Sequence, residues 1–330
     1  MKKQFDVIGI GNAIMDIIAP VPESFLVEHK MDKGGMALID QPRALALNKA
    51  LDKAATTQEV AGGSAANTMV GIAALGARAA YIGKVGKDKV GTALSKGFHA
   101  AGVDFTTSPA KSGQGSGRCL IAVTPDGERT MNTFLGASSL FTKADIVASK
   151  IKAAETLYLE GYLFDSDAAK AAFVSAAQIA KAAGCEVALT LSDSFCVGRH
   201  RKSFRDLVDN HVDILFANED EALSLYETDR LDTALDALNL TKTVSCVTRS
   251  AKGSIIQDGT RRHLVPAAPV DKVVDTTGAG DQYAAGVLTG RAMGMEWADA
   301  GYLGSLCAAE VINHYGARPE KSIHEIAIGA

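Results

Sequence analysis

Cysteine, tryptophan, long apolar runs and an excess of one charge are all scarce in this sequence of 330 residues. Its five cysteines are scattered and never spaced as a CxxC pair, which excludes a disulfide framework and indicates reduced, mostly buried thiols. The seven histidines form no HExxH-like cluster, so we expect no protein-ligated zinc. A net charge of -4 provides no basic surface for nucleic acid.

The longest apolar runs fall short of the roughly 18 residues that a membrane span requires. The opening run, which follows two lysines, could be mistaken for a signal peptide, but Asp6, Asn12 and Asp16 interrupt it. We therefore expect a cytoplasmic protein with small-molecule partners and with neither a membrane nor a nucleic acid as partner.

Short β-branched runs alternate with longer Ala-rich stretches along the chain. The predicted strands are DVIGIG, AAYIGKVG, TLYLEG, EVALTL, DILFAN and VSCVTR, and the predicted helices include SAANTMVGIAALGA, VGTALSKGFHAAG, AAKAAFVSAAQIAKAAG and GYLGSLCAAEVINHYGA. This alternation predicts an α/β fold with a mostly parallel sheet covered by helices on both faces. Ligands of such sheets bind beyond the carboxyl ends of the strands.

Two segments, about 16–40 and 111–136, lack long helical periodicity. The second contains TPDGER, whose Pro-Asp-Gly sequence predicts the turn of a hairpin. We expect both segments to form a small β lid on a single domain, 1–330, because no repeat or linker divides the chain.

The stretch DTTGAGDQYAAG, residues 275–286, places a glycine turn before a predicted helix over 282–293. Gly278 and Gly280 permit a tight turn. The free N–H groups of the helix start and its dipole would attract an anion such as phosphate. Asp281 lies in the first helical turn, where the dipole is expected to lower its pKa. An ordinary capped helix is the alternative interpretation.

A second glycine cluster, AGGSAANTMVGIAALG, covers residues 61–76. Gly62 and Gly63 let the backbone approach a ligand closely, Ser64 is a candidate N-cap, and Asn67 offers both a donor and an acceptor. A glycine turn with an N-cap explains these residues equally well.

Asp16 interrupts the apolar run IMDIIA, four residues after Asn12. A carboxylate in such a run needs a partner, and sugar hydroxyls would provide one; a surface-facing aspartate is the alternative.

Two further strand ends carry polar groups. Asn218 and Glu221, in DILFANEDEA, suit a hydrated Mg²⁺, or they begin an acidic helix. Thr248, Arg249 and Gly253, in VTRSAKGS, could contact phosphate oxygens or form a hairpin turn.

Two other glycine motifs fail as nucleotide-binding sequences. GIGNAI resembles the start of a dinucleotide fingerprint, but Ile14 occupies the position of its third glycine. GKVGKDKVG lacks the spacing of a GxxxxGK[ST] phosphate loop.

GGSAANTMVGIAALG and DTTGAGDQYAAGVL together resemble the two signatures of the ribokinase (pfkB) family of carbohydrate and nucleoside kinases, with matching order and spacing. Within the family, GNAIMD, YLEGYLF, LTLSDSF and HVDILFANEDEA are most similar to adenosine kinases. The resemblance implies a three-layer α/β/α sandwich with a β lid. It also implies ATP-dependent phosphorylation of a nucleoside 5′-hydroxyl, that of adenosine first, with a sugar such as ribose or fructose, inosine or guanosine as the alternative acceptor.

The same resemblance implies roles for individual residues. Asp281 would be the catalytic base, and the amides of Gly278, Ala279 and Gly280 would contact the transferring phosphoryl group. The acceptor would be bound by Asn12, Asp16, Gly62, Gly63, Ser64 and Asn67. ATP would lie along Asn218, Thr248, Arg249, Gly253 and Asn313, and Mg²⁺ would be held by Asn218 and Glu221 through water.

The family likeness also allows a K⁺ requirement. The exposed edges of the lid strands could pair in a homodimer or be covered within a monomer. Leu163 stands where an aromatic side chain would stack on a purine, and Phe195 or Phe134 could replace it. A catalytically silent nucleotide-binding protein is the alternative from another functional class.

Overall fold

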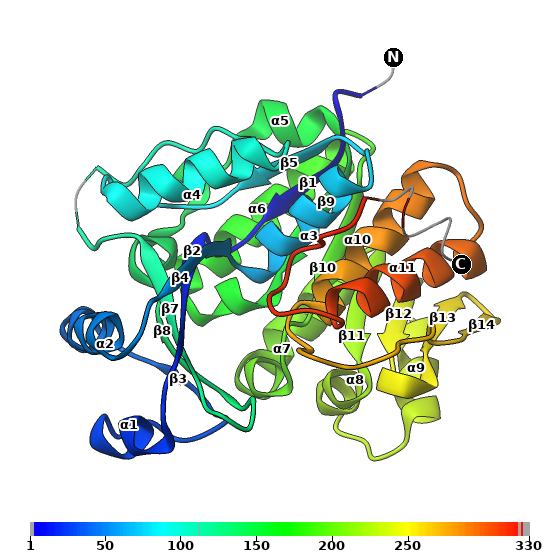
Figure 1. The fold of residues 1–330 in the computed structure, drawn as a ribbon. Coiled ribbons are helices and arrows are strands. Elements are labelled where there is room, and N and C mark those ends of the chain that lie inside the picture. The colour runs from blue at the N-terminus through cyan, green and yellow to red at the C-terminus, as the bar shows by residue number, and fades with distance from the viewer. Residues whose placement is uncertain (1–2, 112, 323–324, 326–330) are drawn as a thin grey trace.

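A nine-stranded sheet forms the centre of the computed structural model, which describes residues 3–111, 113–322 and 325 (Figure 1). The strand order is β14-β13-β12-β11-β10-β9-β1-β5-β6. The strands are β1 (Phe5–Ile10), β5 (Ala79–Ile82), β6 (Asp104–Phe105), β9 (Ala154–Glu160), β10 (Glu186–Thr190), β11 (Ile214–Asn218), β12 (Val244–Thr248), β13 (Ser254–Asp258) and β14 (Arg261–Val265). All pairs from β6 to β12 are parallel, while β13 and β14 are antiparallel. The six predicted strands are confirmed, and so is the fold class.

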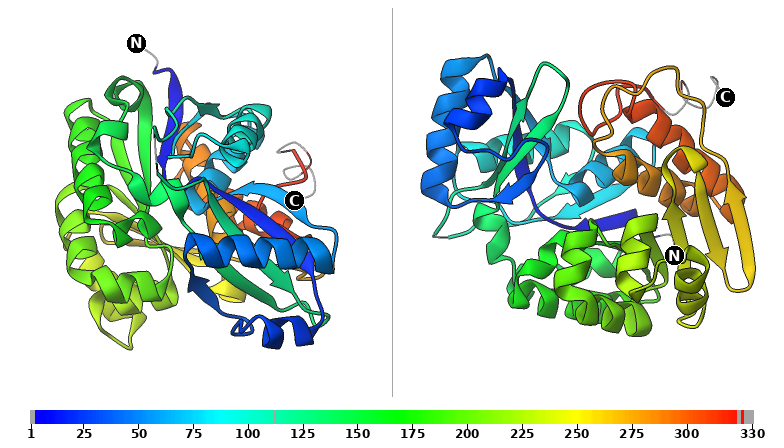
Figure 2. Two further views of the ribbon diagram at one scale, coloured as in Figure 1. Left: turned by 90° about the vertical axis from the view of Figure 1, so that its left-hand side faces the viewer. Right: turned by 90° about the horizontal axis from the view of Figure 1, so that it is seen from below.

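Helices cover both faces of this sheet (Figure 2). One face carries α3 (Ser64–Ala74), α10 (Ala279–Ala292) and α11 (Trp297–Val311), with α4 (Lys89–Ala100) packed beside β6. The other carries α5 (Ala148–Lys152), α6 (Asp167–Ala182), α7 (Ser194–His211), α8 (Glu219–Tyr226) and α9 (Leu231–Asn239). Short 3₁₀ turns lie at Gly136–Leu140, Lys143–Asp145, Gly161–Asp165 and Ser250–Lys252.

Residues of the central strands point alternately to two apolar cores. Val7 of β1 packs in the core beneath α3 and α10, and its neighbour Ile8 packs in the core beneath α5 to α9. Strands that are buried on both faces explain why the sequence shows continuous apolar runs here instead of alternation. All five cysteines are buried and free, as expected.

A second, five-stranded sheet extends from one side of the main body, in the order β3-β8-β7-β2-β4 (Figure 1). Its strands are β2 (Ile14–Pro20), β3 (Met36–Leu38), β4 (Gln58–Gly62), β7 (Gly117–Val123) and β8 (Arg129–Phe134). The TPDGER turn joins β7 to β8 as an antiparallel hairpin, which confirms the predicted turn. We call this sheet, with the helices packed on it, the lid.

The lid contains more of the chain than the two expected segments. Helix α1 (Glu23–Glu28) interrupts the first of them, and α2 (Gln41–Ala54) and β4 follow it. Helix α2 buries Ala44, Leu47 and Leu51, which are spaced three and four residues apart and so share one face of the helix. This face packs on the lid sheet.

The connections bring strand ends and helix starts together at one edge of the main sheet. Strand β1 passes directly into β2, so its glycines open no helix, and GIGNAI is not a dinucleotide-binding turn.

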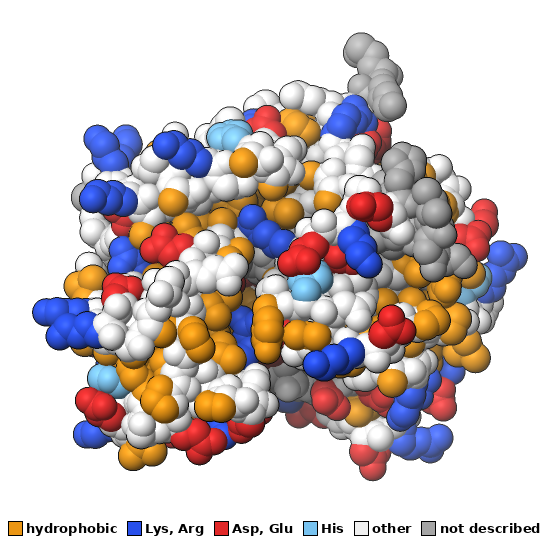
Figure 3. Space-filling view, viewed as in Figure 1, with side chains coloured by type: hydrophobic (Ala, Val, Ile, Leu, Met, Phe, Trp, Pro, Cys, Tyr) orange, Lys and Arg blue, Asp and Glu red, His pale blue; other side chains and the backbone are white. Residues whose placement is uncertain are grey.

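Charged side chains of both signs are interspersed over the face shown in Figure 3. Among the described residues, no helix combines the length and apolarity needed to cross a bilayer.

Candidate active site

The two glycine-rich sequences meet around the carboxylate of Asp281. The Ser64 hydroxyl donates to one Asp281 oxygen at 2.6 Å, and the Asn67 side-chain amide donates to the other at 3.1 Å. Both donors come from the first turn of α3, which packs against α10 (Figure 1). Ser64 was predicted as an N-cap, but Gly63 occupies that position and the Ser64 hydroxyl serves Asp281 instead.

The environment of Asp281 raises its pKa to about 7. Burial is the largest cause, and the charges of Glu160 and Asp16 add to it, whereas the bonds from Ser64 and Asn67 act in the opposite direction. The expectation of a lowered pKa is therefore wrong, because burial raises the pKa of Asp281 more than the hydrogen bonds from Ser64 and Asn67 lower it. A carboxyl group with this pKa is suited to accept a proton near neutral pH.

Of the two glycines in the turn before Asp281, packing within the protein requires Gly278 but not Gly280. Gly278 has φ +79°, and a Cβ there would lie 2.6 Å from the backbone of Ala317. A Cβ on Gly280 would meet nothing within 4 Å. Within the described residues, the amides of Gly280 and Asp281 donate no hydrogen bond to the backbone. The turn therefore leaves these two N–H groups without a backbone partner, as an anion site requires.

Asp16 lies on β2 at the base of the lid, next to the second glycine pair. Burial raises its pKa to about 6, against the lowering effect of the Arg129 and Arg318 charges. A Cβ on Gly62 would lie 2.5 Å from the Asp16 carboxylate. Gly63 has φ +106°, and a Cβ there would lie 2.0 Å from the Asn12 carbonyl oxygen. Both glycines are thus required by the close packing of β1, β2 and α3.

Glu160 organises this packing, and we did not predict it. Its carboxylate, at the end of β9, accepts from the Asn12 backbone (3.2 Å), the Asn12 side chain (2.9 Å) and the Ala65 backbone (2.8 Å). Glu160 is only 1 % exposed, and burial raises its pKa to about 7. A glutamate ending an apolar strand in YLEGYLF was the available signal.

A second unpredicted contact joins the lid to the main body. Arg129, at the start of β8, forms an ion pair with the buried carboxylate of Asp275, in the loop that leads to α10. Asp275 also accepts from the Thr277 backbone and hydroxyl and from the Gly316 backbone. Asp275 therefore connects the lid, the glycine turn and the segment after α11.

Asn218 and Glu221 lie at the start of α8, where they bond to each other. The Glu221 backbone donates to the Asn218 side-chain oxygen at 2.8 Å, and the Asn218 backbone and side chain donate to the two Glu221 carboxylate oxygens at 3.0 and 2.8 Å. This capping box is the helix-start alternative for these residues. Burial raises the pKa of Glu221 to about 7.

Thr248, Arg249 and Gly253 lie in the tight turn between β12 and β13. The buried Nε of Arg249 forms an ion pair with the Glu219 carboxylate at 3.5 Å but no hydrogen bond to any described residue. Gly253 has φ +79°, and a Cβ there would meet the Val265 carbonyl oxygen at 2.0 Å. Asn313 follows α11 and donates to the Ala309 carbonyl at 2.6 Å. The hairpin alternative thus accounts for the local positions of Thr248, Arg249 and Gly253.

The three positions considered for stacking on a purine base lie in different parts of the molecule. Leu163 is buried in the apolar core beneath α5 to α9, and Phe134 is buried on the lid. Phe195 is 79 % exposed in the first turn of α7, beyond the carboxyl end of β10. Of the three, Phe195 alone offers a free ring surface.

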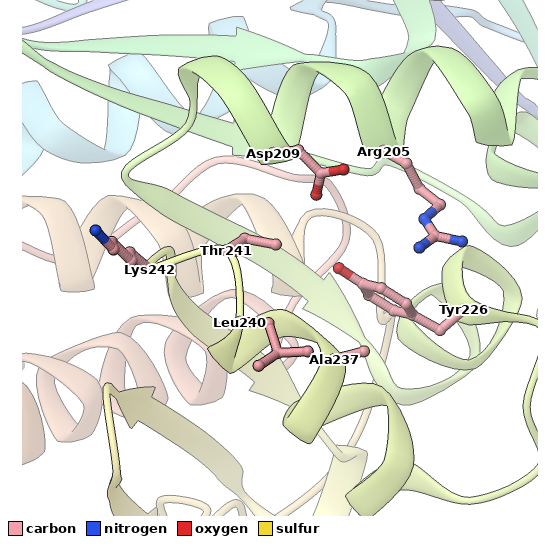
Figure 4. A pocket seen from close by; sticks show the side chains of 7 residues that line it. All are labelled: Arg205, Asp209, Tyr226, Ala237, Leu240, Thr241 and Lys242. Atoms are coloured by element: carbon pink, nitrogen blue, oxygen red, sulfur yellow. The ribbon is translucent and has the colours of Figure 1, made fainter.

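A separate cavity of about 540 Å³ lies between α7, α8 and α9 (Figure 4). The guanidinium of Arg205 lies 5.1 Å from the centre of the Tyr226 ring, and Lys242 lies just before β12 begins. The cavity is therefore near the amino ends of the strands and contains none of the predicted site residues.

Comparison with known proteins identifies the family. The pfkB family carbohydrate kinase profile matches residues 28–323. The crystal structure of adenosine kinase from Sinorhizobium meliloti is 45 % identical, covers 99 % of both chains and superposes with a TM-score of 0.91. A probable sugar kinase from Rhizobium etli CFN 42 is 43 % identical over 99 % of this chain and 98 % of that one, with a TM-score of 0.92.

Saccharomyces cerevisiae adenosine kinase is 28 % identical over 327 residues, covering 93 % of this chain and 94 % of its own. The resemblance seen in the two glycine-rich sequences is therefore confirmed: this chain belongs to the pfkB family of carbohydrate kinases, enzymes that phosphorylate hydroxyl groups.

Proposed function

We propose that this kinase transfers the γ-phosphoryl group of ATP to the 5′-hydroxyl of a nucleoside, with adenosine as the first candidate. The observation that carries the proposal is the position of Asp281, beside a turn of free amides and held by two donors from α3. The names of the relatives from Sinorhizobium meliloti and Saccharomyces cerevisiae support adenosine as acceptor.

In the proposed reaction, the acceptor oxygen forms a bond to the γ-phosphorus while the bond to the ADP oxygen breaks. Asp281 orients the acceptor hydroxyl and receives its proton, and the bonds from Ser64 and Asn67 fix the direction of the carboxylate. The amides of Gly278 and Gly280 stabilise the charge on the phosphoryl oxygens, whereas the Ala279 amide already donates to the Thr276 carbonyl oxygen at 3.2 Å. Phosphoryl transfer needs little covalent help, so positioning and charge stabilisation provide most of the catalysis.

The donor set is compatible with ATP and Mg²⁺. The free amides at the start of α10 suit phosphate, and the guanidinium of Arg249 would provide a further cationic donor for the nucleotide, alongside Thr248, Gly253 and Asn313. Both Glu221 oxygens already accept from Asn218, so the two residues would hold Mg²⁺ through its water ligands. When bound, the ion would neutralise charge on the phosphates.

The acceptor would lie between Asp16 and Asp281. The buried side-chain oxygen of Asn67 accepts no hydrogen bond from the described residues, so it is available to a ligand hydroxyl. Asn12 and the backbone at Gly62 and Gly63 form the wall behind Asp16. The lid contact between Arg129 and Asp275 would close the site against water, which would otherwise compete as phosphoryl acceptor.

The test is ADP release from MgATP with adenosine, guanosine, inosine, ribose and fructose offered separately. Preference for adenosine, with AMP as product, is the expected result. Preference for a free sugar would overturn the nucleoside proposal, a possibility motivated by the Rhizobium etli relative named a probable sugar kinase. Absence of turnover with all five acceptors would contradict the proposal and favour a silent nucleotide-binding protein.

A further inference from the structure

Arg318 is a partly buried arginine beside the active site. It follows Ala317, which packs against Gly278 of the catalytic turn and accepts a hydrogen bond from Gln282 of α10 at 2.9 Å. The backbone at Arg318 is thus fixed to the element that carries Asp281.

Aromatic packing holds the Arg318 side chain in place. Its guanidinium lies 5.7 Å from the centre of the Phe98 ring. Phe98 is fully buried and packs edge-on against Tyr81, at 5.2 Å between ring centres. A guanidinium over an aromatic ring keeps its N–H groups free to point away from the stacking surface.

Two of these N–H groups have no partner. The Nε and Nη2 atoms of Arg318 are buried and form no hydrogen bond within the described part of the chain. Burial lowers the pKa of Arg318 to about 10, and the nearby charge of Asp16 opposes this effect. Buried donors without acceptors are costly, so their presence beside a ligand site indicates that a ligand supplies the acceptor.

Asp16 is the counterpart of Arg318 on the lid side. Each influences the pKa of the other, yet no ion pair joins them among the described residues, and the Asp16 carboxylate forms no hydrogen bond there either. The Asp16 carboxylate only accepts hydrogen bonds when ionised, and Arg318 only donates them. A hydroxyl group does both.

We infer that Arg318 and Asp16 together bind the vicinal hydroxyls of the acceptor sugar, and that Arg318 makes the enzyme selective for a complete diol. This inference rests on the proposed function. One hydroxyl donates to Asp16, and the oxygen of one hydroxyl accepts from Arg318. An anionic group, such as a phosphate on the acceptor, fits less well because Asp16 would repel it.

The experiment compares adenosine, 2′-deoxyadenosine and 3′-deoxyadenosine as acceptors for the wild type, R318M and R318K. R318M keeps an unbranched chain over Phe98 but removes every donor, and R318K keeps the charge without the planar fork. R291M is the matched control, because the Arg291 guanidinium also lies over an aromatic ring, 4.2 Å from the centre of Trp297, at the far end of α10.

For R318M we expect kcat/KM with adenosine to fall about 10- to 100-fold, the effect of losing a charged hydrogen-bond donor. The value should stay nearly unchanged with whichever deoxy analogue lacks the contacted hydroxyl, so that discrimination between diol and deoxy acceptors disappears. The KM for ATP should not change, R318K should lie between R318M and the wild type, and R291M should retain wild-type discrimination.

Equal losses with all three acceptors, or no loss with any, would overturn the inference while leaving the proposed function intact. If the wild type phosphorylates ribose but no nucleoside, the proposed acceptor is wrong, and ribose with 2-deoxyribose then applies the same criterion to Arg318. Absence of turnover with every acceptor would overturn both proposals.

Discussion

Helices α8 and α10 both begin beyond the carboxyl edge of the sheet, and both carry a carboxylate in the first turn. Burial raises the pKa of Glu221 on α8 and of Asp281 on α10 to the same value, about 7. Their hydrogen bonds differ. Glu221 completes the cap of its own helix with Asn218, whereas Asp281 receives its bonds from α3, more than 200 residues earlier in the chain.

The caps of the two helices differ as well. The side chain of Asn218 accepts from the Glu221 amide of α8, while Gly278 caps α10 with no side-chain acceptor for its amides. A burial-shifted carboxylate at a helix start therefore does not define a catalytic group by itself. The glycine cap, which places no side chain over the helix start, and the partners from a distant element are what distinguish α10.

The largest effect is expected for D281N. This variant keeps the size of the side chain but cannot accept a proton, so kcat should fall by about a hundred- to ten-thousand-fold. Adenosine should still bind, because Asp16 and the pocket wall are unchanged. Steady-state rates together with calorimetric binding of adenosine test this, and near wild-type kcat would remove Asp281 from the mechanism.

A smaller but still large loss of activity is expected for G280A. A Cβ at this position meets no protein atom within 4 Å, so the variant should unfold at the wild-type temperature. The methyl group would occupy space meant for the phosphoryl group, and a displacement of that size should reduce kcat/KM about a hundred-fold. G198A is the control, since Gly198 on α7 also faces open space. Wild-type activity of G280A would refute phosphoryl binding at this turn.

E221Q should have a moderate effect of a different kind. Loss of the negative charge should raise the Mg²⁺ concentration for half-maximal rate about ten-fold, as for residues that act on a metal through intermediates. The rate at saturating Mg²⁺ should recover most of the wild-type value. An unchanged Mg²⁺ requirement would restrict Glu221 to its capping role.

The smallest effect concerns stability. Because the folded-state pKa of Asp281 lies above its ordinary value of 3.8, folding is favoured at low pH, and that contribution is lost as pH rises toward about 7. D281N should therefore be more stable than the wild type at pH 8, by on the order of 2 kcal/mol, and by less at pH 5. D167N, which alters an exposed first-turn acid of α6, is the control. A gain in the stability of D281N that does not depend on pH would contradict the conclusion that burial raises the pKa of Asp281.

Local sequence patterns were sufficient for much of the fold. The apolar runs located β1, β5 and β9 to β12, and the glycine turn located the start of α10, because these features depend on neighbours in the chain. Helix α2 escaped prediction, although its buried residues have helical spacing. The hairpin at Thr248 to Gly253 and the capping box at Asn218 were present in the sequence as alternatives, which the local pattern could not rank.

The contacts that define the site join distant segments, and single-sequence patterns do not reveal them. Glu160 bonds to Asn12 across 148 residues, and Arg129 pairs with Asp275 across 146. The pKa of Asp281 was predicted in the wrong direction for the same reason, because the helix dipole is a local property whereas burial by α3 is not.

The measurement that tests the central claim most directly is the pH dependence of kcat/KM for adenosine in the wild type and in S64A. Asp281 must be deprotonated to act as base, so the wild-type value should fall below about pH 7. In S64A this fall should begin at higher pH, because the Ser64 hydroxyl lowers the pKa of Asp281. A flat wild-type profile, or a fall at the same pH in both proteins, would contradict the role of Asp281 as a base tuned by α3.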